Sequence, residues 1–158
     1  MAETPKRDWS QFTCRIAIKA SPARVFRAWT DDKLVSRWFT EKTVIEPKKN
    51  GRIYFEWTAG DTFETTVTSI VKNRKFVFPF DAEGTMVEVK FKKDGRGCVC
   101  ELRQYNMKTS PEMKWNMHRG CITGWTFFMT NLKAYLEHGI DLRGHDPKKS
   151  YKQNYVNS

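Results

Sequence analysis

The sequence predicts a single α+β domain with an antiparallel sheet of about six to seven strands, two short helices after the first strand and one long C-terminal helix. Three observations lead to this prediction. The chain has 158 residues, the usual length of one domain with a substantial core. Segments that alternate between hydrophobic and polar residues, divided by turn sequences, fill most of residues 11–105. A hydrophobic stripe with spacings of three and four residues then covers 121–136.

The first strand and the two short helices are predicted from local signals. Residues 11–18 carry hydrophobic side chains at every second position, which is typical of a half-buried strand. Ser21 is followed directly by proline, a typical helix start, because serine caps the first turn and proline suits its first position. Thr30 or Asp31 is expected to cap a second short helix that ends near Trp38.

The central part of the chain is predicted to form further strands that are separated by tight turns. The Asn-Gly pair at residues 50–51 is a strong hairpin signal, because both residue types accept the positive φ of such turns. Further turn sequences lie at 59–61 and 93–95. An aromatic strand over 75–80 is expected to stop at or near Pro79, since proline cannot donate to a sheet.

The long helix is predicted to start at Thr109, which matches a capping box with Glu112, or at Ser110 one residue later. Beyond the first turn no proline interrupts the chain as far as His138, and Gly139 stands where a helix-ending glycine belongs. The polar and basic residues that follow are expected to form a loosely held tail.

Composition and charge limit the classes of function. Lys and Arg outnumber Asp and Glu by 28 to 18, which gives a formal net charge of +10, but acidic residues are interspersed among the basic ones. No RNA-binding signature and no long basic helix accompanies this charge, so we expect a solvated surface and no nucleic-acid partner. No hydrophobic run approaches the roughly 18 residues of a membrane span, and the N-terminus lacks the hydrophobic stretch of a secretory signal.

The domain organisation is predicted to be simple. No repeat and no low-complexity linker divides the chain, so we expect an N-terminal extension over 1–10, one domain over 11–142 and a basic tail over 143–158. The four cysteines are too few for a disulfide scaffold and show no Cys-x-x-Cys spacing. Reduced thiols, and therefore a cytoplasmic location, are expected.

The reactive residue types do not form a recognisable metal or catalytic set. Cys14, Cys98 and Cys100 are predicted to face inward, where thiolates would suit a soft metal. We interpret them as small buried hydrophobic residues, because no histidine lies at ligand spacing. His118 and Cys121 are three residues apart on the long helix, but a Cys–His nucleophile also needs an orienting group. We therefore expect no catalytic residue, no metal and no cofactor.

Two segments of the chain resemble a known family. Residues 16–40 contain a strand, a Ser-Pro helix start, a spaced Ala-Trp-Thr and an aromatic pair, and residues 124–139 contain Gly-Trp followed by leucines at helical spacing. The matching residues are Ser21, Pro22, Val25, Ala28, Trp29, Trp38, Phe39, Gly124, Trp125, Leu132 and Leu136. This pattern resembles the SRPBCC superfamily, which includes START and birch-allergen proteins, and within it the family of the activator of heat-shock-protein-90 ATPase.

The resemblance implies a helix-grip fold, in which a curved sheet wraps around the final helix and leaves a cavity that the short helices partly close. Members of the superfamily include lipid carriers, cyclases and chaperone regulators, so the fold alone does not assign a function. Our leading expectation is a non-enzymatic binding domain that holds a small hydrophobic or amphipathic molecule between the sheet and the C-terminal helix. The alternative for the cavity is that its side chains meet and fill the space.

Strand and helix periodicity predicts the side chains that would form the walls of such a cavity. They are Trp38, Phe39, Phe55, Trp57, Phe63, Phe78, Cys100, Leu102, Trp125 and Met129.

Two other function classes stay open. The first is a chaperone-associated protein-interaction module, which the family resemblance and the basic surface suggest. The second is a cyclase- or hydrolase-like enzyme, for which a buried acid or histidine would have to face the cavity. The best polar candidates for such a role are Glu41, Glu64, Glu101 and Arg103, although strand phase places Glu64 and Glu101 on the surface.

Overall fold

A computed structural model describes residues 2, 6–149 and 154–157 of the chain. The strands are β1 (Phe12–Ile18), β2 (Lys42–Ile45), β3 (Arg52–Glu56), β4 (Thr62–Thr66), β5 (Ser69–Val71), β6 (Lys75–Phe80), β7 (Thr85–Asp94) and β8 (Gly97–Tyr105). The helices are α1 (Pro22–Thr30), α2 (Asp32–Val35), α3 (Pro111–Met113), η1 (Lys114–His118) and α4 (Arg119–His138). The predicted α+β class and the order of elements are confirmed.

The strands form two antiparallel sheets, one of five strands in the order β1-β8-β7-β6-β5 and one of three in the order β2-β3-β4. The chain passes from one to the other at two consecutive residues. The amide of Val67 donates to the carbonyl of Gly51 beside the three-stranded sheet, and the amide of Thr68 donates to the carbonyl of Val77 in the five-stranded sheet. Val67 is fully buried at this corner. The sharp bend therefore divides what would otherwise be one curved sheet.

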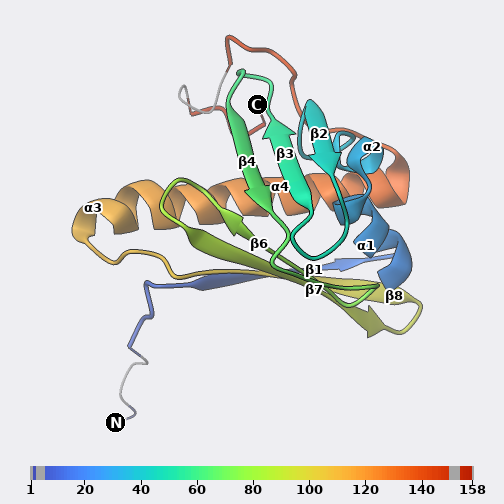
Figure 1. Cartoon of the computed structure of the whole chain (residues 1–158), viewed down its shortest axis with the longest axis horizontal. Helices are drawn as coiled ribbons and strands as arrows, with labels where there is room; N and C mark the ends of the chain where they lie inside the picture. The colour runs from blue at the N-terminus through green and yellow to red at the C-terminus, as the bar shows by residue number, and fades with distance from the viewer. Residues whose placement is uncertain (1, 3–5, 150–153, 158) are drawn as a thin grey trace.

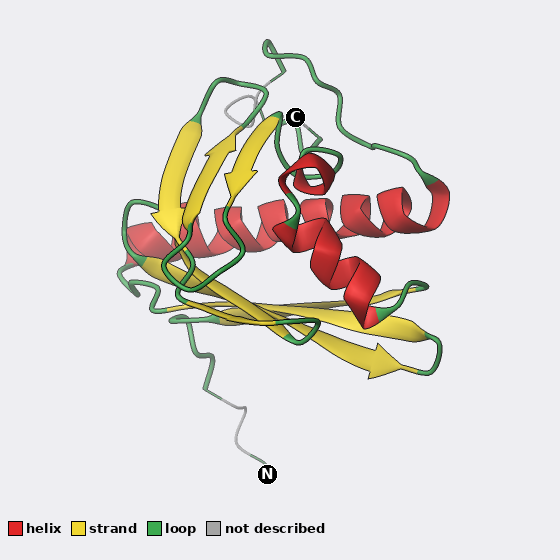
Figure 2. Ribbon diagram, turned by 45° about the vertical axis from the view of Figure 1, so that its right-hand side comes forward, coloured by secondary structure: helices red, strands yellow, loops and turns green. Residues whose placement is uncertain are grey.

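The long helix lies between the two sheets. Figures 1 and 2 show α4 running along one face of the five-stranded sheet, and in Figure 1 the three-stranded sheet crosses in front of α4. The short helices α1 and α2 lie near the C-terminal end of α4. This arrangement is the helix-grip architecture, and its core fills the space enclosed by the two sheets and α4.

The predicted helix boundaries are largely confirmed by side-chain caps. The Ser21 hydroxyl accepts from the amide of Arg24 at 3.2 Å, and the Asp31 carboxylate caps α2. The helical run before α4 begins at Ser110, the second of the two predicted starts, whose hydroxyl accepts from the amide of Met113. Gly139 ends α4 in the left-handed region, with a φ of 67°.

One turn of the long helix differs from the prediction. Residues Lys114–His118 form a π-helical turn, η1, rather than a continuous α-helix. Such a turn carries an extra residue and therefore rotates the helix face that precedes it. Here His118 packs edge-to-face on Trp9, before β1, and on Phe12 of β1, while Met113 and Met117 line the space inside the fold.

The expectation of a loosely held tail is wrong for residues 141–145. The side chain of Arg143 is only 2% exposed and donates to the carbonyls of Ser36 at 3.0 Å and Thr40 at 2.8 Å. Asn131 on α4 accepts from the amide of Leu142 at 2.7 Å. The carbonyls after α2 lack partners within their own short helix, and the guanidinium supplies them. A tertiary contact of this kind leaves no local signal in the sequence.

Positions 1, 3–5, 150–153 and 158 of the predicted N-terminal extension and tail lie outside the described residues. Among the residues that the structure does describe, no helix is long and hydrophobic enough to cross a membrane.

Candidate ligand-binding cavity

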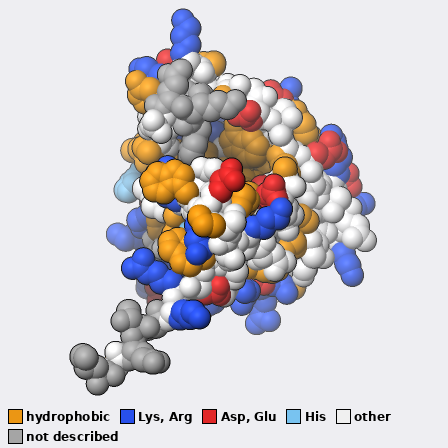
Figure 3. Space-filling model, turned by 90° about the vertical axis from the view of Figure 1, so that its left-hand side faces the viewer, with side chains coloured by type: hydrophobic (Ala, Val, Ile, Leu, Met, Phe, Trp, Pro, Cys, Tyr) orange, Lys and Arg blue, Asp and Glu red, His pale blue; other side chains and the backbone are white. Residues whose placement is uncertain are grey.

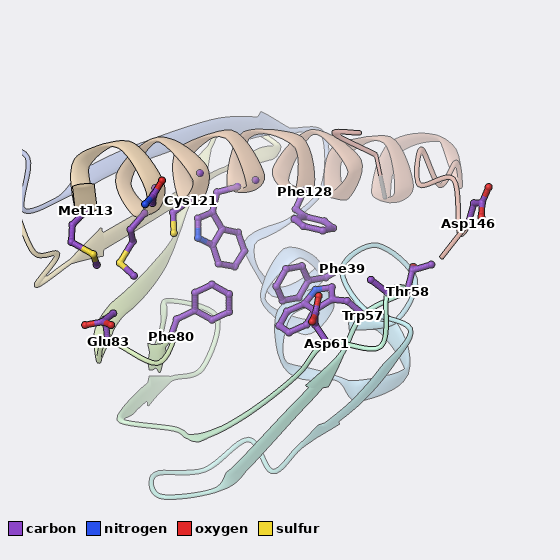
Figure 4. A pocket seen from close by; sticks show the side chains of 16 residues that line it. Phe39, Trp57, Thr58, Asp61, Phe80, Glu83, Met113, Cys121, Phe128 and Asp146 are labelled. Carbon is purple, nitrogen blue, oxygen red and sulfur yellow. The ribbon is translucent and has the colours of Figure 1, made fainter. Parts of the chain in front are cut away.

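A cavity of about 540 Å³ lies between the helical run α3–η1–α4 and the loops and strands opposite (Figure 4). The helical wall is formed by Met113, Asn116, Met117, Gly120, Cys121, Gly124, Trp125 and Phe128. The opposite wall is formed by Phe39, Trp57, Thr58, Ala59, Asp61, Phe80, Glu83 and Asp146. Most of these side chains are hydrophobic or aromatic, as in typical small-molecule sites.

The helical wall leaves room because it carries glycine where a larger residue would project into the cavity. A Cβ atom built on Gly120 would meet no other atom within 4 Å, apart from its chain neighbours and the helix's own backbone. Glycine inside a helix is less favourable than alanine by about 1 kcal/mol, so local helix stability does not explain its presence. The absence of a side chain at Gly120 therefore leaves empty space at this point of the cavity wall.

Aromatic rings make the inner wall of the cavity rigid. Phe39, in the turn that follows α2, stacks on Trp125 of α4 with ring centres 5.2 Å apart. It also meets Phe128 edge-on at 4.9 Å and Trp57 edge-on at 5.4 Å. Phe80 packs against the other side of this group, 5.2 Å from Trp125. Since each ring is held by its neighbours, the cavity wall is already formed without a ligand.

A buried hydrogen-bond chain behind Trp125 fixes its ring. The indole N–H donates to Oε1 of Gln104 at 2.9 Å, and Gln104 is fully buried on β8. The amide nitrogen of Gln104 donates to the hydroxyl of Thr85 at 2.8 Å, and that hydroxyl lies 2.5 Å from a carboxylate oxygen of Asp81. The polar edge of the indole is thus satisfied inside the protein, and its hydrophobic surface is left for the cavity.

The thiol of Cys121 lies on the cavity wall but is not activated. Burial, together with the charge of Asp81, raises the pKa of Cys121 to about 11, so the group is a neutral thiol at physiological pH. Gln104 donates a long hydrogen bond to its sulfur. The ring of His118, three residues earlier, instead has its Nδ1 atom 3.2 Å from the carbonyl of Trp9. The arrangement provides no Cys–His nucleophile.

The structure brings three of the predicted wall residues, Phe39, Trp57 and Trp125, to the cavity. The half-buried Phe63 packs on Phe80 at 5.5 Å. The other predicted residues are core side chains no more than 2% exposed: Trp38, Phe55, Phe78, Cys100, Leu102 and Met129. The alternation of side chains along a strand identifies those that face the helix. It does not identify which of them border an empty space. Contact of any of these residues with a ligand stays a prediction.

Sequence reasoning did not single out several lining residues. Cys121 and Phe128 belong to the predicted hydrophobic stripe of the long helix, so a signal for them was present. Met117 lines the cavity from the unexpected π-helical turn, and Met113 lines it from the last residue of α3, directly before that turn. Gln104 could have been found as a polar residue at an inward position of its strand.

The polar residues considered for acid–base chemistry mostly form ion pairs outside the cavity. Glu64 pairs with Arg52 at 2.6 Å, and Glu101 pairs with Lys92 at 3.1 Å. The hydrogen bond from Arg52 lowers the pKa of Glu64. Burial acts to raise the pKa of Glu101, but hydrogen bonds from Lys92 and Arg15 bring it below its usual value. Within the described ranges of the chain, no three His, Cys, Asp or Glu side chains are arranged to hold a metal ion.

The tail is attached beside the cavity by His145, which lies between two carboxylates. Its Nε2 atom is 2.7 Å from Asp141, and its Nδ1 atom contacts Glu41. The hydrogen bond to Asp141 is the main reason why the pKa of His145 is raised. Burial acts to raise the pKa of Asp141, but hydrogen bonds from Arg143 and His145 hold it well below its usual range. The next residue, Asp146, lines the cavity, and its Oδ1 atom accepts from the amide of Lys148 at 3.0 Å.

A model of the family described as "Activator of Hsp90 ATPase homolog 1-like protein" matches residues 19–137, more than half of the chain. No curated protein matches the chain.

Solved structures with the same fold come from several organisms. The Aha1 dimer from Colwellia psychrerythraea is 22% identical with a TM-score of 0.72, over 82% of this chain and 97% of that one. An HSP90 activator from Plasmodium falciparum is 20% identical with a TM-score of 0.67, over 80% and 96%. CalU16 from Micromonospora echinospora is 20% identical with a TM-score of 0.65, over 82% and 77%. At these identities the likeness establishes the fold alone.

Proposed function

The chain belongs to the family of activator of Hsp90 ATPase homolog 1-like proteins, within the SRPBCC superfamily, and we propose that it is a non-enzymatic binding domain for a small hydrophobic or amphipathic molecule. The ligand would occupy the cavity between the helical run and the sheets. The main support is the cavity itself, whose volume of about 540 Å³ lies in the range of typical ligand sites.

The form of the cavity wall supports binding rather than catalysis. Its aromatic rings are held by each other, and the indole of Trp125 is held from behind by Gln104. A rigid wall loses little conformational freedom when a ligand enters, which favours affinity. The thiol of Cys121 is protonated and buried, so it does not act as a nucleophile or a base at neutral pH.

Native mass spectrometry of freshly purified protein, followed by denaturing extraction, tests this proposal. We expect a small hydrophobic molecule to co-purify, or an added alkyl compound to bind with a stoichiometry of one. Gly120→Leu should remove the bound mass, because the new side chain occupies the cavity. Thr130→Leu is the matched control, since it adds the same side chain on the exposed face of α4. An empty protein that also binds no alkyl compound would contradict the proposal.

A second candidate function is that of a chaperone-associated interaction module. It is supported by family membership and by the likeness to a structure described as an HSP90 activator. The test is a pull-down with the heat-shock protein 90 chaperone and a measurement of its ATPase rate with and without this chain. The candidate predicts complex formation and a changed rate. No binding and an unchanged rate would eliminate it.

A further inference from the structure

The charged side chains that line the cavity are all acidic. They are Asp61, Glu83 and Asp146, and none of the lining residues in the described part of the chain is Lys, Arg or His. In Figure 4, Glu83 lies toward the Met113 end of the helical wall, Asp61 lies beside the ring of Trp57, and Asp146 lies beyond Phe128. Figure 3 shows a recess with a hydrophobic floor, and near its rim it shows acidic side chains with Lys or Arg side chains beside them. The charged residues of the lining itself are therefore all negative, and they border a hydrophobic interior.

This acidic lining is opposite in sign to the rest of the protein. The chain carries 28 Lys and Arg residues and a formal charge of +10. A ligand site with average surface composition would therefore be expected to include basic residues. At physiological ionic strength the field of distant charges is screened over about 8 Å, so the nearest carboxylates decide which charge is favoured at the cavity.

Three separate segments hold these carboxylates in place. The turn that carries Asp61 is closed by a backbone hydrogen bond of 2.9 Å from Trp57 to the Asp61 carbonyl. Asp146 follows His145, which is bound to Asp141. Glu83 forms an ion pair with Lys108, so part of its charge is neutralised. Asp61 and Asp146, which form no ion pair among the described residues, are therefore the carboxylates that a ligand would meet.

The aromatic interior of the cavity attracts a positively charged group. It does not offer the indole N–H of Trp125 as a hydrogen-bond donor to a negatively charged group. The faces of aromatic rings carry partial negative charge and attract cations. The rings of Phe39, Phe80 and Trp57 line this cavity. The indole N–H of Trp125, which an anion would need, is already bonded to Gln104. Both the rim and the interior thus favour the same sign of ligand.

We propose that the cavity selects its ligand by charge, and that the ligand has a hydrophobic body with a cationic end, such as an alkyl amine. A fatty acid or another anionic amphiphile of equal size is disfavoured. This inference rests on the proposed binding function and names the chemical class of its ligand.

The test compares decylamine, decanol and decanoate, which share one alkyl chain and differ in charge. Binding is titrated at pH 7 and 150 mM salt, below the concentration at which the compounds aggregate, from the fluorescence of the tryptophans at the cavity. Exposed ion pairs contribute about 0.2–1 kcal/mol each, so decylamine is expected to bind about threefold to tenfold more tightly than decanoate. Decanol should fall between them.

The double variant Asp61→Asn, Asp146→Asn should reduce this preference to less than about twofold, because each change removes one carboxylate charge at nearly constant volume. Asp94→Asn, on the distant β7–β8 turn, is the control and should leave the preference unchanged. Equal binding of the three compounds, tighter binding of decanoate, or an unchanged preference in the double variant would overturn the charge inference while the binding function stands. Failure of all three compounds to bind would overturn both.

Discussion

Replacement of Gly120 by leucine tests the cavity most directly, because it should raise stability while it removes binding. A Cβ atom at this position meets nothing within 4 Å, so a side chain added here starts in free space. Leucine is a better helix former than glycine by roughly 0.8 kcal/mol. We therefore expect the free energy of unfolding to rise by about 0.5–1 kcal/mol. For a domain of this size, 1 kcal/mol corresponds to a shift in Tm of about 2–4 °C.

The same leucine should interfere with the ligand. Its side chain would occupy part of the roughly 540 Å³ cavity, which Gly120 lines. A ligand that needs this space must then lose burial of several methylene groups, each worth about 0.8 kcal/mol. We expect the affinity for decanol to fall by at least about tenfold, which corresponds to about 1.4 kcal/mol.

The assay combines thermal unfolding, followed by circular dichroism, with fluorescence titration of decanol. Gly120→Ala is the intermediate variant, because it gives the same gain in helix stability with only one methyl group in the cavity. A lower Tm for Gly120→Leu would show that the space beside Gly120 is already filled. An unchanged affinity together with a higher Tm would show that the alkyl chain binds elsewhere.

Three further predictions concern the groups that hold the cavity wall and the tail. Arg143→Met removes the hydrogen bonds from a buried guanidinium to two backbone carbonyls, and should lower the free energy of unfolding by about 2–3 kcal/mol in denaturant titrations. The pKa of His145 is raised by its carboxylate partners, so its contribution to stability should be complete below its unfolded pKa of about 6.5 and lost as pH rises through the higher folded value. Unfolding at several pH values should therefore show a decline above about pH 6.5 that is absent in His145→Gln. Gln104→Leu leaves the buried indole N–H of Trp125 without an acceptor and should cost about 1–3 kcal/mol, part of which a second change, Trp125→Phe, should restore.

Each of these predictions has a result that would contradict it. A loss below about 0.5 kcal/mol in Arg143→Met would mean that the hydrogen bonds of Arg143 contribute little to the stability of the domain. The same pH dependence in His145→Gln and in the unchanged chain would assign the transition to another group. Strictly additive losses in the Gln104 and Trp125 double variant would mean that their hydrogen bond is not the source of the cost.

The sequence by itself determined the elements of this protein, because their signals act over a few residues. A serine before a proline starts α1, and a glycine with free access to positive φ ends α4 at Gly139. The alternation of hydrophobic residues in β8 predicts which of its side chains face inward, and every second residue from Cys98 is buried. The two family-like segments predicted how these elements combine, and the helix-grip fold is confirmed.

Only the tertiary structure decided where the cavity lies and which residues line it. The corner at Val67 and Thr68 depends on bonds to two different sheets, and the burial of Arg143 depends on carbonyls about a hundred residues earlier in the chain. A cavity remains where side chains from distant parts of the sequence do not fill the space between them. Periodicity therefore identifies which side chains face each other, but not whether space is left between them. The ten predicted wall residues all belong to the interior or its margin for this reason, and the packed fold left free space before Phe39, Trp57 and Trp125.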